Sequence, residues 1–535
     1  MLPTSKSRPV HRRAAALALA VPLALAACAG SAENAGDQLV LADVGDFGQY
    51  NPMLGYGALG VSPVYEGLLQ PSAPDDTTLP GLVPALAAER PVRTAPRRWR
   101  VTLREGIRFS DGTAFDAADV VATYRAMVDP AVAADISTQI GPITDVAADG
   151  PSAVIVTLST DADPSPYLLV GIVPSEKVEA APAGDWALNA APVGTGPYRL
   201  DSLRPDQAVF VARDDYWRGP LALRRLVYTA APDDNNRAQR VSAGEVDGAT
   251  LPPRLAESLR ATPGVDVVAV HTADWRGVSL PKNNPFTADV AARRAMNVAV
   301  DRDALVSGVL AGFGSPASTP ISDAYGAAFE PTAQFRFDPR QAAQILDQAG
   351  WRPGGDGIRV KDGRQARFAL LYPAEDTVRR DLAVAFAAAM KRVGIHVDPR
   401  GASWDHIDTR LDEDAVLLGG GETPYSIDSQ VYDTLHTQVP GGSPYSNPGD
   451  FTAPGMDALL DAARQSAPGA ENDARYRQIQ TLYARYPSGV FLTFLQHTYA
   501  SRTAGWTHDA PILEPHSHGV LWGPWWNLPS WRPPS

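Results

Sequence analysis

The sequence predicts a chain of mixed strands and helices that folds into two or more lobes. Residues 99–124 contain signals for a strand, a turn and a helix in direct succession. The chain has 535 residues, which is more than one hydrophobic core usually serves, so more than one lobe is expected. Apolar and aromatic residues are spread throughout, which indicates an ordered chain despite its 48 prolines.

Residues 99–124, WRVTLREGIRFSDGTAFDAADVVATY, show this pattern most clearly. Apolar and polar residues alternate at the start, as in a half-buried strand. A second short strand is expected at 107–109, followed by an Asp-Gly turn. Asp116 then precedes the helical run AADVVATYR, and Asp119 lies three residues further on. This spacing predicts a helix that begins with a capping box.

Other segments carry weaker signals of the same kinds. Residues 37–70 begin with a strand and a polar turn, and VSPVYEGLLQP at 61–71 then predicts a helix. Residues 153–158 predict a strand, and residues 267–283 predict two strands around a bend.

The first 27 residues have the features of a secretory signal. Basic residues precede an apolar run that ends at Ala27 and is shorter than the ~20 residues needed to span a bilayer. Cys28 follows Leu-Ala-Ala, so we predict that it is lipidated and becomes the first residue of the mature protein. The alternative is a plain signal peptide with an incidental cysteine. Residues 28–36 are small and polar, which favours a flexible tether.

The mature chain is expected to be strongly acidic. Removal of residues 1–27 takes away four positive and no negative charges, so the formal net charge goes from −13 to −17. This balance argues against nucleic acid as a partner and against adsorption to anionic lipid. Membrane attachment would therefore depend on the lipid anchor. Cys28 is the only cysteine, so no disulfide is expected and the fold must be held by core burial.

An ordered set of motifs resembles those of the bacterial extracellular solute-binding proteins of family 5, the peptide- and nickel-binding components of ABC importers. Residues 99–124 are similar to the family segment W-x-F-x-L-R-x-G-V-x-F-x-D-G-x-P-F-x-A-x-D-V-V. Further matches are Y-E-G-L at 65–68, G-T-G-P-Y at 194–198 and N-P-F at 284–286. The resemblance spans nearly the whole mature chain.

The resemblance implies an α/β fold of two lobes joined by a hinge of two strands, as in periplasmic binding proteins of type II, cluster C. One lobe would hold residues 37–278 and 499–535, with an extra subdomain inserted at about 75–190. The other lobe would hold residues 279–498. Closure of the hinge would trap the ligand, which is then delivered to ABC permease subunits with cytoplasmic ATPases. The expected form is a monomer, lipid-anchored at the outer face of the cytoplasmic membrane or in the periplasm.

The sequence offers no catalytic arrangement. It contains neither GxSxG nor HExxH, and its one cysteine is assigned to the lipid. We therefore expect a binding protein without a cofactor, not an enzyme. Short peptides are the expected ligand, because they are the largest ligand class of the family that the chain resembles. Nickel or a nickel chelate is the alternative within the family, and a surface-anchored hydrolase is the alternative from another class.

The histidines near the carboxyl terminus are candidate metal ligands. His516 and His518 are two residues apart and would face the same side of a strand. With His508 or His497 they could supply imidazoles for nickel. No carboxylate or cysteine spacing beyond Glu514 supports such a site, so packing or loop roles are preferred and no metal site is predicted.

Residues 414–437 are the best candidate for the ligand site. A buried strand, AVLL, ends in three glycines and a polar loop. The candidate ligand-binding residues are Gly420, Gly421, Glu422, Tyr425 and Asp428. Glycines allow a close backbone approach, and a carboxylate can pair with the ammonium of a peptide. A solvated loop with an Asp N-cap is the alternative. In peptide-binding relatives this region follows a G-W pair, and Gly420 stands where that Trp would be.

Aromatic residues from other segments are expected around the ligand. These candidates are Tyr56, Trp275, Trp404 and Trp522. Trp522 belongs to a tryptophan-rich tail whose alternative role is packing against the first lobe. The peptide backbone is expected along residues 275–283, bound in the manner of an added strand.

Overall fold

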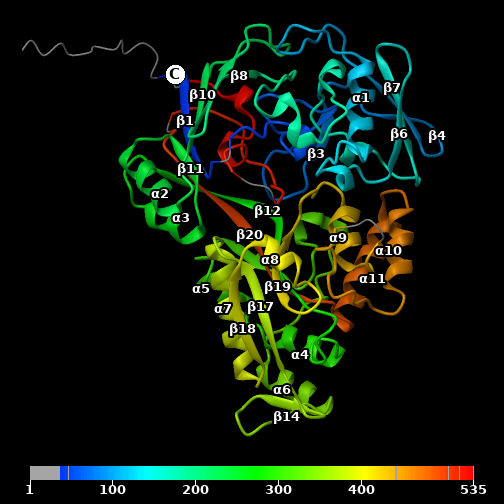
Figure 1. Cartoon of the computed structure of the whole chain (residues 1–535), viewed down its shortest axis with the longest axis vertical. Helices are drawn as coiled ribbons and strands as arrows, with labels where there is room; N and C mark the ends of the chain where they lie inside the picture. The colour runs from blue at the N-terminus through cyan, green and yellow to red at the C-terminus, as the bar shows by residue number, and fades with distance from the viewer. Residues whose placement is uncertain (1–35, 46, 440–442, 504, 517–518, 534–535) are drawn as a thin grey trace, which may run out of the picture. The chain divides into compact units, whose positions relative to one another are not determined.

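A computed structural model describes residues 36–45, 47–439, 443–503, 505–516 and 519–533, which are built around one large mixed sheet. Among these residues the sheet has eleven strands, in the order β18-β17-β19-β12-β20-β11-β1-β10-β9-β8, with β13 paired to β20. Its two longest strands, β12 (Asp266–Ser279) and β20 (Val490–Ser501), pair side by side in the middle (Figure 1). β12 also pairs with β19, and β20 also pairs with β11. The two strands therefore connect the two halves of the sheet.

The first half of the sheet is formed mainly by early strands of the chain. These are β1 (Gln38–Asp43), β8 (Tyr198–Arg204), β9 (Gln207–Ala212), β10 (Arg225–Ala230) and β11 (Gly248–Thr250). Two helices, α2 (Asp234–Ala243) and α3 (Pro253–Leu259), pack beside β11 and β20. β1 confirms the strand predicted at the start of residues 37–70.

Residues 69–190 contain smaller sheets and one long helix. β2 (Leu69–Ser72) pairs with β3 (Gly81–Pro84). A four-stranded sheet follows, in the order β4 (Val92–Ala95), β5 (Arg98–Thr102), β7 (Ala153–Leu158) and β6 (Ile143–Ala148), with α1 (Ala117–Val128) against it.

The local predictions for residues 99–124 are largely confirmed. β5 and α1 form as expected, and Asp116 and Asp119 make both hydrogen bonds of a capping box. The strand expected at 107–109 is wrong, because only a single bridge joins Arg108 to Ala114 there. β7 confirms the strand at 153–158.

The helix predicted at 61–71 is wrong, because this segment has no helical residues and enters strand β2 at Leu69. Its carbonyl groups accept hydrogen bonds from distant residues: Gly196 N–H donates to Val64 O at 2.8 Å, and Ile172 N–H donates to Glu66 O at 3.0 Å. Gly67 lies so close to Leu169 that a Cβ would sit 2.3 Å from the Leu169 carbonyl oxygen. Partners from other parts of the chain therefore outweigh the local helical pattern.

The second half of the sheet is surrounded by helices. Its strands are β17 (Arg367–Pro373), β18 (His396–Ala402) and β19 (Ala415–Gly420), and β13 (Gly314–Pro316) lies against β20. The helices are α4 (Val290–Ala299), α5 (Arg302–Gly308), α6 (Pro339–Gln348), α7 (Thr377–Arg392), α8 (Trp404–Asp408), α9 (Ile427–Leu435), α10 (Met456–Arg464) and α11 (Ala470–Arg485). A small sheet joins β14 (Arg352–Pro353), β15 (Arg359–Lys361) and β16 (Arg364–Gln365).

The two strands predicted within 267–283 are one continuous strand, β12. The bend that the sequence indicated is a shift of register between His271 and Trp275 in the pairing with β20. Thr272, inside this shift, forms a bridge to Glu514 instead. The lobe limits proposed from the sequence stay predictions.

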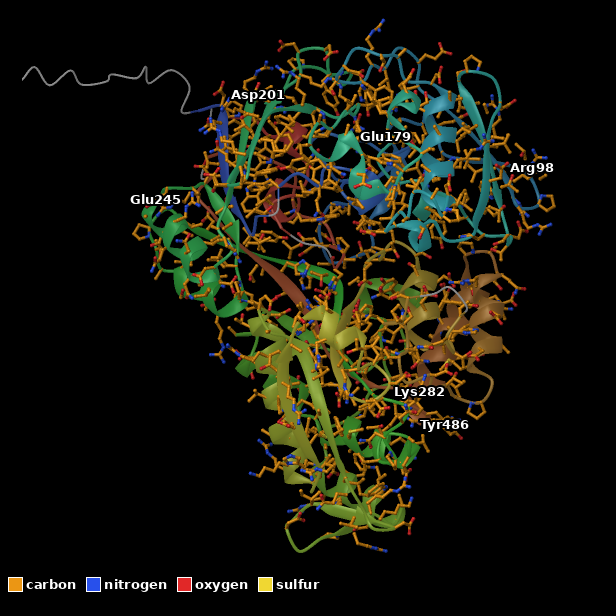
Figure 2. All side chains as sticks on the ribbon, viewed as in Figure 1. Arg98, Glu179, Asp201, Glu245, Lys282 and Tyr486 are labelled. Carbon is orange, nitrogen blue, oxygen red and sulfur yellow. The ribbon has the colours of Figure 1, made fainter. Side chains whose placement is uncertain are left out.

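Charged side chains lie on the surface of the protein. Arg98, Asp201 and Glu245 are exposed at its periphery (Figure 2). No helix within the described ranges is long and apolar enough to cross a membrane. Residues 1–35 lie outside the described residues, so the predicted signal peptide, Cys28 and most of the tether have no structural account.

Candidate ligand-binding site

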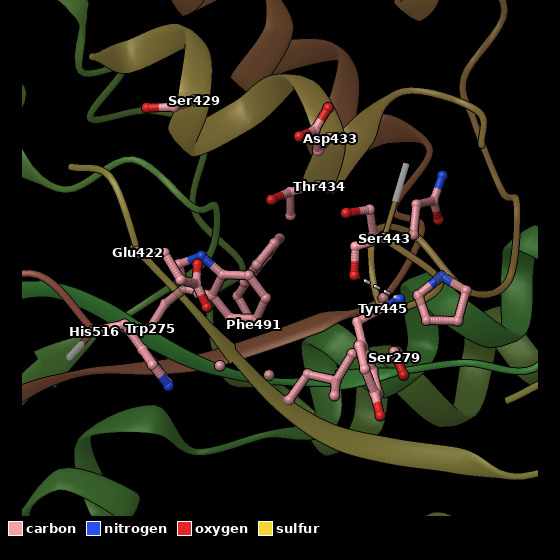
Figure 3. Close-up of a pocket in the computed structure, with 18 of the residues that line it drawn as sticks. Trp275, Ser279, Glu422, Ser429, Asp433, Thr434, Ser443, Tyr445, Phe491 and His516 are labelled. Carbon is pink, nitrogen blue, oxygen red and sulfur yellow. Dashed lines mark hydrogen bonds between the residues drawn. The ribbon is translucent and has the colours of Figure 1, made fainter. Parts of the chain in front are cut away.

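A cavity of about 620 Å³ lies beside the two central strands. β12 and β20 contribute Trp275 and Phe491 to its floor, and α9 contributes Asp433 and Thr434 to a wall on the other side (Figure 3). Tyr167, from the segment between β7 and β8, closes part of another wall. The lining therefore joins elements that are far apart in the sequence. We call this space the central cavity.

The glycines at the end of β19 determine what lies on the cavity floor. Gly420 is paired directly with Trp275 on β12, and a Cβ on Gly420 would sit 2.4 Å from the Trp275 ring. A Cβ on Gly419 would sit 2.6 Å from both Arg276 Nη1 and His516 Cε1. The space that side chains would occupy on β19 is thus filled by an indole, a guanidinium and an imidazole. These glycines leave room for Trp275 and His516 on the cavity lining and for Arg276 beside it.

Two carboxylates on the lining are available to a ligand. Glu422 and Asp433 are exposed, and neither makes an ion pair within the described residues. Asp433 was not identified from the sequence. The signal for it is helical spacing, because Ser429 and Asp433 are four residues apart on α9 and both line the cavity.

The third carboxylate of the lining, Asp428, already has a partner. Arg464 Nε donates to both of its oxygens, at 2.9 and 3.1 Å, and the guanidinium lies 3.1 Å from the centre of the Tyr432 ring. Burial raises the pKa of Asp428, although Arg464 acts in the opposite direction. Asp428 is therefore held in a fixed pair at the edge of the cavity.

Arg379 places a cation on the lining. It lies in the first turn of α7, where Nη1 donates to the N-cap residue Asp376 at 2.8 Å. Its Nε is buried and has no acceptor among the described residues. Burial, together with the nearby Arg276, lowers the pKa of Arg379 to about 10. Trp404 lies against this guanidinium, with 5.9 Å between Cζ and the ring centre.

A buried ionic network lies directly behind the floor. Asp274 on β12 is fully buried and forms an ion pair with Arg276. His516 Nδ1 lies 2.7 Å from Asp274 Oδ1, and His497 Nε2 lies 3.1 Å from Asp274 Oδ2. Burial alone would raise the pKa of Asp274, but Arg276 and the two histidines outweigh it and hold that pKa well below its usual range.

The network continues to the carboxyl-terminal segment through Glu514. His497 Nδ1 lies 2.8 Å from Glu514 Oε2, and Tyr499 OH donates to the same oxygen at 2.7 Å. Burial raises the pKa of Glu514. Burial opposes the charge on His497, but hydrogen bonds to Asp274 and Glu514 outweigh it and raise the pKa of His497. This network is not among the predictions from the sequence; its signal is a set of polar residues within two otherwise apolar strands.

The structure brings some of the predicted ligand residues together and leaves others apart. The central cavity is lined by Trp275, Trp404, Gly420, Glu422, Asp428 and His516. Residues not on its lining are Tyr56, Gly421, Tyr425 and Trp522. Trp522 belongs to the hydrophobic core of the first half, Tyr56 packs against that core, and Tyr425 lines a neighbouring cavity.

The metal candidates do not gather into a site. His508 stacks on Trp531, with 4.8 Å between ring centres, away from His516 in the network. His518 lies outside the described residues. Within the residues that the structure describes, no three side chains of His, Cys, Asp or Glu are grouped so as to hold a metal ion.

The architecture is that of two-lobed binding proteins. The oligopeptide-binding protein AppA from Bacillus subtilis, solved with a nonapeptide, matches with a TM-score of 0.75 and 21% identity. The match covers 93% of this chain and 99% of that one. This likeness shows the fold and confirms the α/β, two-lobed prediction.

Sequence comparison gives the family. The profile of "Bacterial extracellular solute-binding proteins, family 5 Middle" matches residues 81–441. Protein XP55 of Streptomyces lividans is 36% identical, over 93% of this chain and 91% of its own length. The nickel-binding periplasmic protein of Escherichia coli is 27% identical, over 72% of this chain and 76% of its own length. The chain belongs to the bacterial extracellular solute-binding proteins of family 5.

Membership confirms the family resemblance found in the motifs. The protein is a solute-binding component of the ABC importer class, and its homologues are binding proteins and not enzymes. Family members act in the periplasm or outside the cell.

Proposed function

We propose that this protein captures short peptides in the central cavity and delivers them to an ABC permease, while a lipid on Cys28 holds it at the membrane. Closure of two lobes about β12 and β20 would enclose the ligand. These strands support the proposal because they connect the two halves of the sheet. The limits expected at 278/279 and 498/499 lie within or at the end of these two strands.

The observation that carries the peptide proposal is the charge distribution of the lining. Glu422 and Asp433 offer carboxylates without an ion pair in the described part of the chain, and the Arg379 guanidinium, paired with Asp376, also lies on the lining. A free peptide carries one ammonium and one carboxylate, so both of its ends have partners in the same cavity. Trp275 and Phe491 add aromatic surface between them.

A nickel chelate is the second candidate. The nickel-binding relative of Escherichia coli supports it, and so does Arg379, because a guanidinium also binds the carboxylates of an organic chelator. Such a ligand does not require the free carboxylates of Glu422 and Asp433. The two candidates therefore differ in whether the carboxylates of Glu422 and Asp433 contribute to ligand binding.

Binding of trialanine, with and without an acetyl group on its amino end, tests the proposal by calorimetry. A hydrogen bond to a charged group contributes about 1.5–3 kcal/mol. Glu422→Gln or Asp433→Asn should therefore weaken binding about ten-fold to a hundred-fold, and acetylation should weaken wild-type binding similarly. Asp201→Asn, an exposed carboxylate away from the cavity, is the matched control.

Mass spectrometry of what co-purifies with the protein completes the test. Recovery of peptides, with a loss of affinity on acetylation, supports the proposal. Peptide binding that is unchanged by acetylation and by both substitutions would show that no carboxylate here holds an ammonium. Recovery of a nickel chelate with no affinity for peptides would replace the peptide by the second candidate.

A further inference from the structure

The carboxyl-terminal segment makes a further connection between the two halves of the sheet. Where β12 shifts out of register with β20, Ala273 N–H donates to Glu514 O at 2.9 Å, and Glu514 N–H donates to His271 O at 3.0 Å. Two residues further on, His516 N–H donates to Gly421 O at 2.9 Å. The stretch from Glu514 to His516, which we call the tail segment, therefore joins β12 to the loop that follows β19.

The tail segment ties the core of the first half to a wall of the central cavity. Beyond it, the chain is packed into that core through three tryptophans, Trp522, Trp525 and Trp531. The loop that it holds begins at Gly421 and continues with Glu422, a carboxylate of the cavity lining. His516 itself also lines the cavity (Figure 3). A displacement of the tail segment would therefore change the ligand site.

A histidine between two carboxylates holds the tail segment in place. His497 on β20 is buried, with Nδ1 2.8 Å from Glu514 Oε2 and Nε2 3.1 Å from Asp274 Oδ2. A neutral imidazole has one N–H, and an ionised carboxylate can only accept a hydrogen bond. Both contacts therefore need one additional proton, whether the ring or a carboxylate carries it.

Loss of this proton would act on the tail segment. Asp274 keeps two other partners, Arg276 and His516. Glu514 makes no other ion pair within the described residues, and its remaining donors there, a tyrosine hydroxyl and a backbone N–H, are neutral. A buried carboxylate without a cation is strongly disfavoured, so Glu514 is the group that has to move.

The other charged groups near His497 are already paired or lie in solvent. His497 borders a space of about 610 Å³, whose charged lining residues are Asp234, Arg237, Arg276, Glu375, Asp376 and Arg379. Each of these arginines forms an ion pair with an aspartate, and Glu375 is exposed. The proton between His497 and Glu514 therefore has no substitute among these groups.

We propose that the proton shared by His497 and Glu514 regulates the ligand site, by holding the tail segment against the loop that contains Glu422. With the proton present, His516 keeps its bond to the Gly421 carbonyl and the loop is ready for the ligand. Once the proton is lost, the tail segment is released, and binding has to reorder the loop. Affinity for peptide therefore falls as pH rises. This inference rests on the proposed peptide function.

Calorimetry with trialanine from about pH 6 to about pH 9 tests this switch. The ammonium of the peptide also titrates in this range, so the quantity compared is the ratio of wild-type affinity to that of His497→Gln. A glutamine amide donates a hydrogen bond at every pH, and the titration of the peptide cancels in the ratio. The two carboxylates raise the pKa of His497 against the opposing effect of burial. The ratio should fall at least about five-fold as pH rises through that pKa.

A second variant and a titration of wild type make the test specific. Glu514→Gln removes the carboxylate and offers an amide N–H to His497, so its affinity relative to His497→Gln should not change with pH. In wild type, trialanine should raise the pKa of His497, followed by NMR of the imidazole, because proton and peptide favour the same state. His508→Gln is the matched control, since that ring stacks on Trp531 away from the network, and it should behave as wild type.

The outcomes separate the switch from the proposed function. A constant ratio of wild type to His497→Gln, with a pKa of His497 that trialanine leaves unchanged, would refute the switch while the proposed function stands. If His497→Gln does not fold, the NMR titration of wild type decides alone. If trialanine binds wild type at no pH, the proposed function fails and the switch fails with it.

Discussion

Replacement of Gly420 by alanine tests why β19 ends in glycines. A Cβ at this position would lie 2.4 Å from Cε2 and Cζ2 of Trp275, closer than non-bonded atoms approach. The indole cannot move freely, because it is 8% exposed and packs edge-on against Phe491, with 4.8 Å between ring centres. Overpacking of this kind costs about 1–3 kcal/mol. We expect Gly420→Ala to lower the free energy of unfolding by that amount.

A double-mutant cycle assigns the cost to the indole. Trp275→Ala alone should cost about 3–5 kcal/mol, as large-to-small changes at buried positions do. In the Trp275→Ala background the clash is gone, so Gly420→Ala should cost close to nothing. The coupling between the two positions should therefore be about 1–3 kcal/mol.

Urea unfolding of wild type, both single variants and the double variant measures this coupling. Gly184→Ala is the control, because a Cβ at Gly184 meets nothing within 4 Å. An equal cost of Gly420→Ala with and without the indole would refute the reasoning. The glycine would then be required for a reason other than room for Trp275.

Three further outcomes are expected. The pKa of His497 is raised in the folded protein, so protonated His497 stabilises the fold below about pH 6.5. This contribution is lost as pH rises through the folded-state pKa. The excess stability of wild type over His497→Gln in urea should therefore shrink as pH rises through that range; a constant difference would contradict it. Asp428→Asn should cost about 1–3 kcal/mol, because Arg464 loses its partner, and Arg464→Gln in that background should recover most of the loss in thermal unfolding. Cys28→Ala should move the protein from the membrane to the soluble fraction on centrifugation, since several acyl chains anchor stably; continued sedimentation with membranes would exclude the anchor.

Some local signals in the sequence predicted local structure correctly. The capping box of α1 depends on Asp116 and Asp119, three residues apart, and needs no other part of the chain. The helix predicted at 61–71 failed because its backbone is bound by Gly196, Ile172 and other remote residues. The sequence alone indicates interactions between residues close together in the chain, such as a capping box. It does not indicate hydrogen bonds between remote segments.

The candidate site was predictable only in part for the same reason. Glu422 and Asp428 follow a glycine-rich strand end, which is a local signal. Arg379 and Tyr167 come from other segments and reach the cavity only through the fold. The absence of a tryptophan at Gly420 was visible in the sequence. In the structure Trp275, on the paired strand, lies beside Gly420. This pairing depends on the register of β12 and β19, which the sequence does not reveal.

The buried network indicates which part of the site is rigid. Charges buried between strands are tolerated only when they are paired, and the Asp274 carboxylate has Arg276, His497 and His516 as partners. Glu514 ties the carboxyl-terminal segment to the same place, because Ala273 N–H donates to its carbonyl oxygen at 2.9 Å. Bending of β12 at this point would break several of these contacts together. Trp275 and His516 lie on the cavity floor and adjoin the network, so the floor should keep its shape if the proposed closure moves the wall that contains Tyr167.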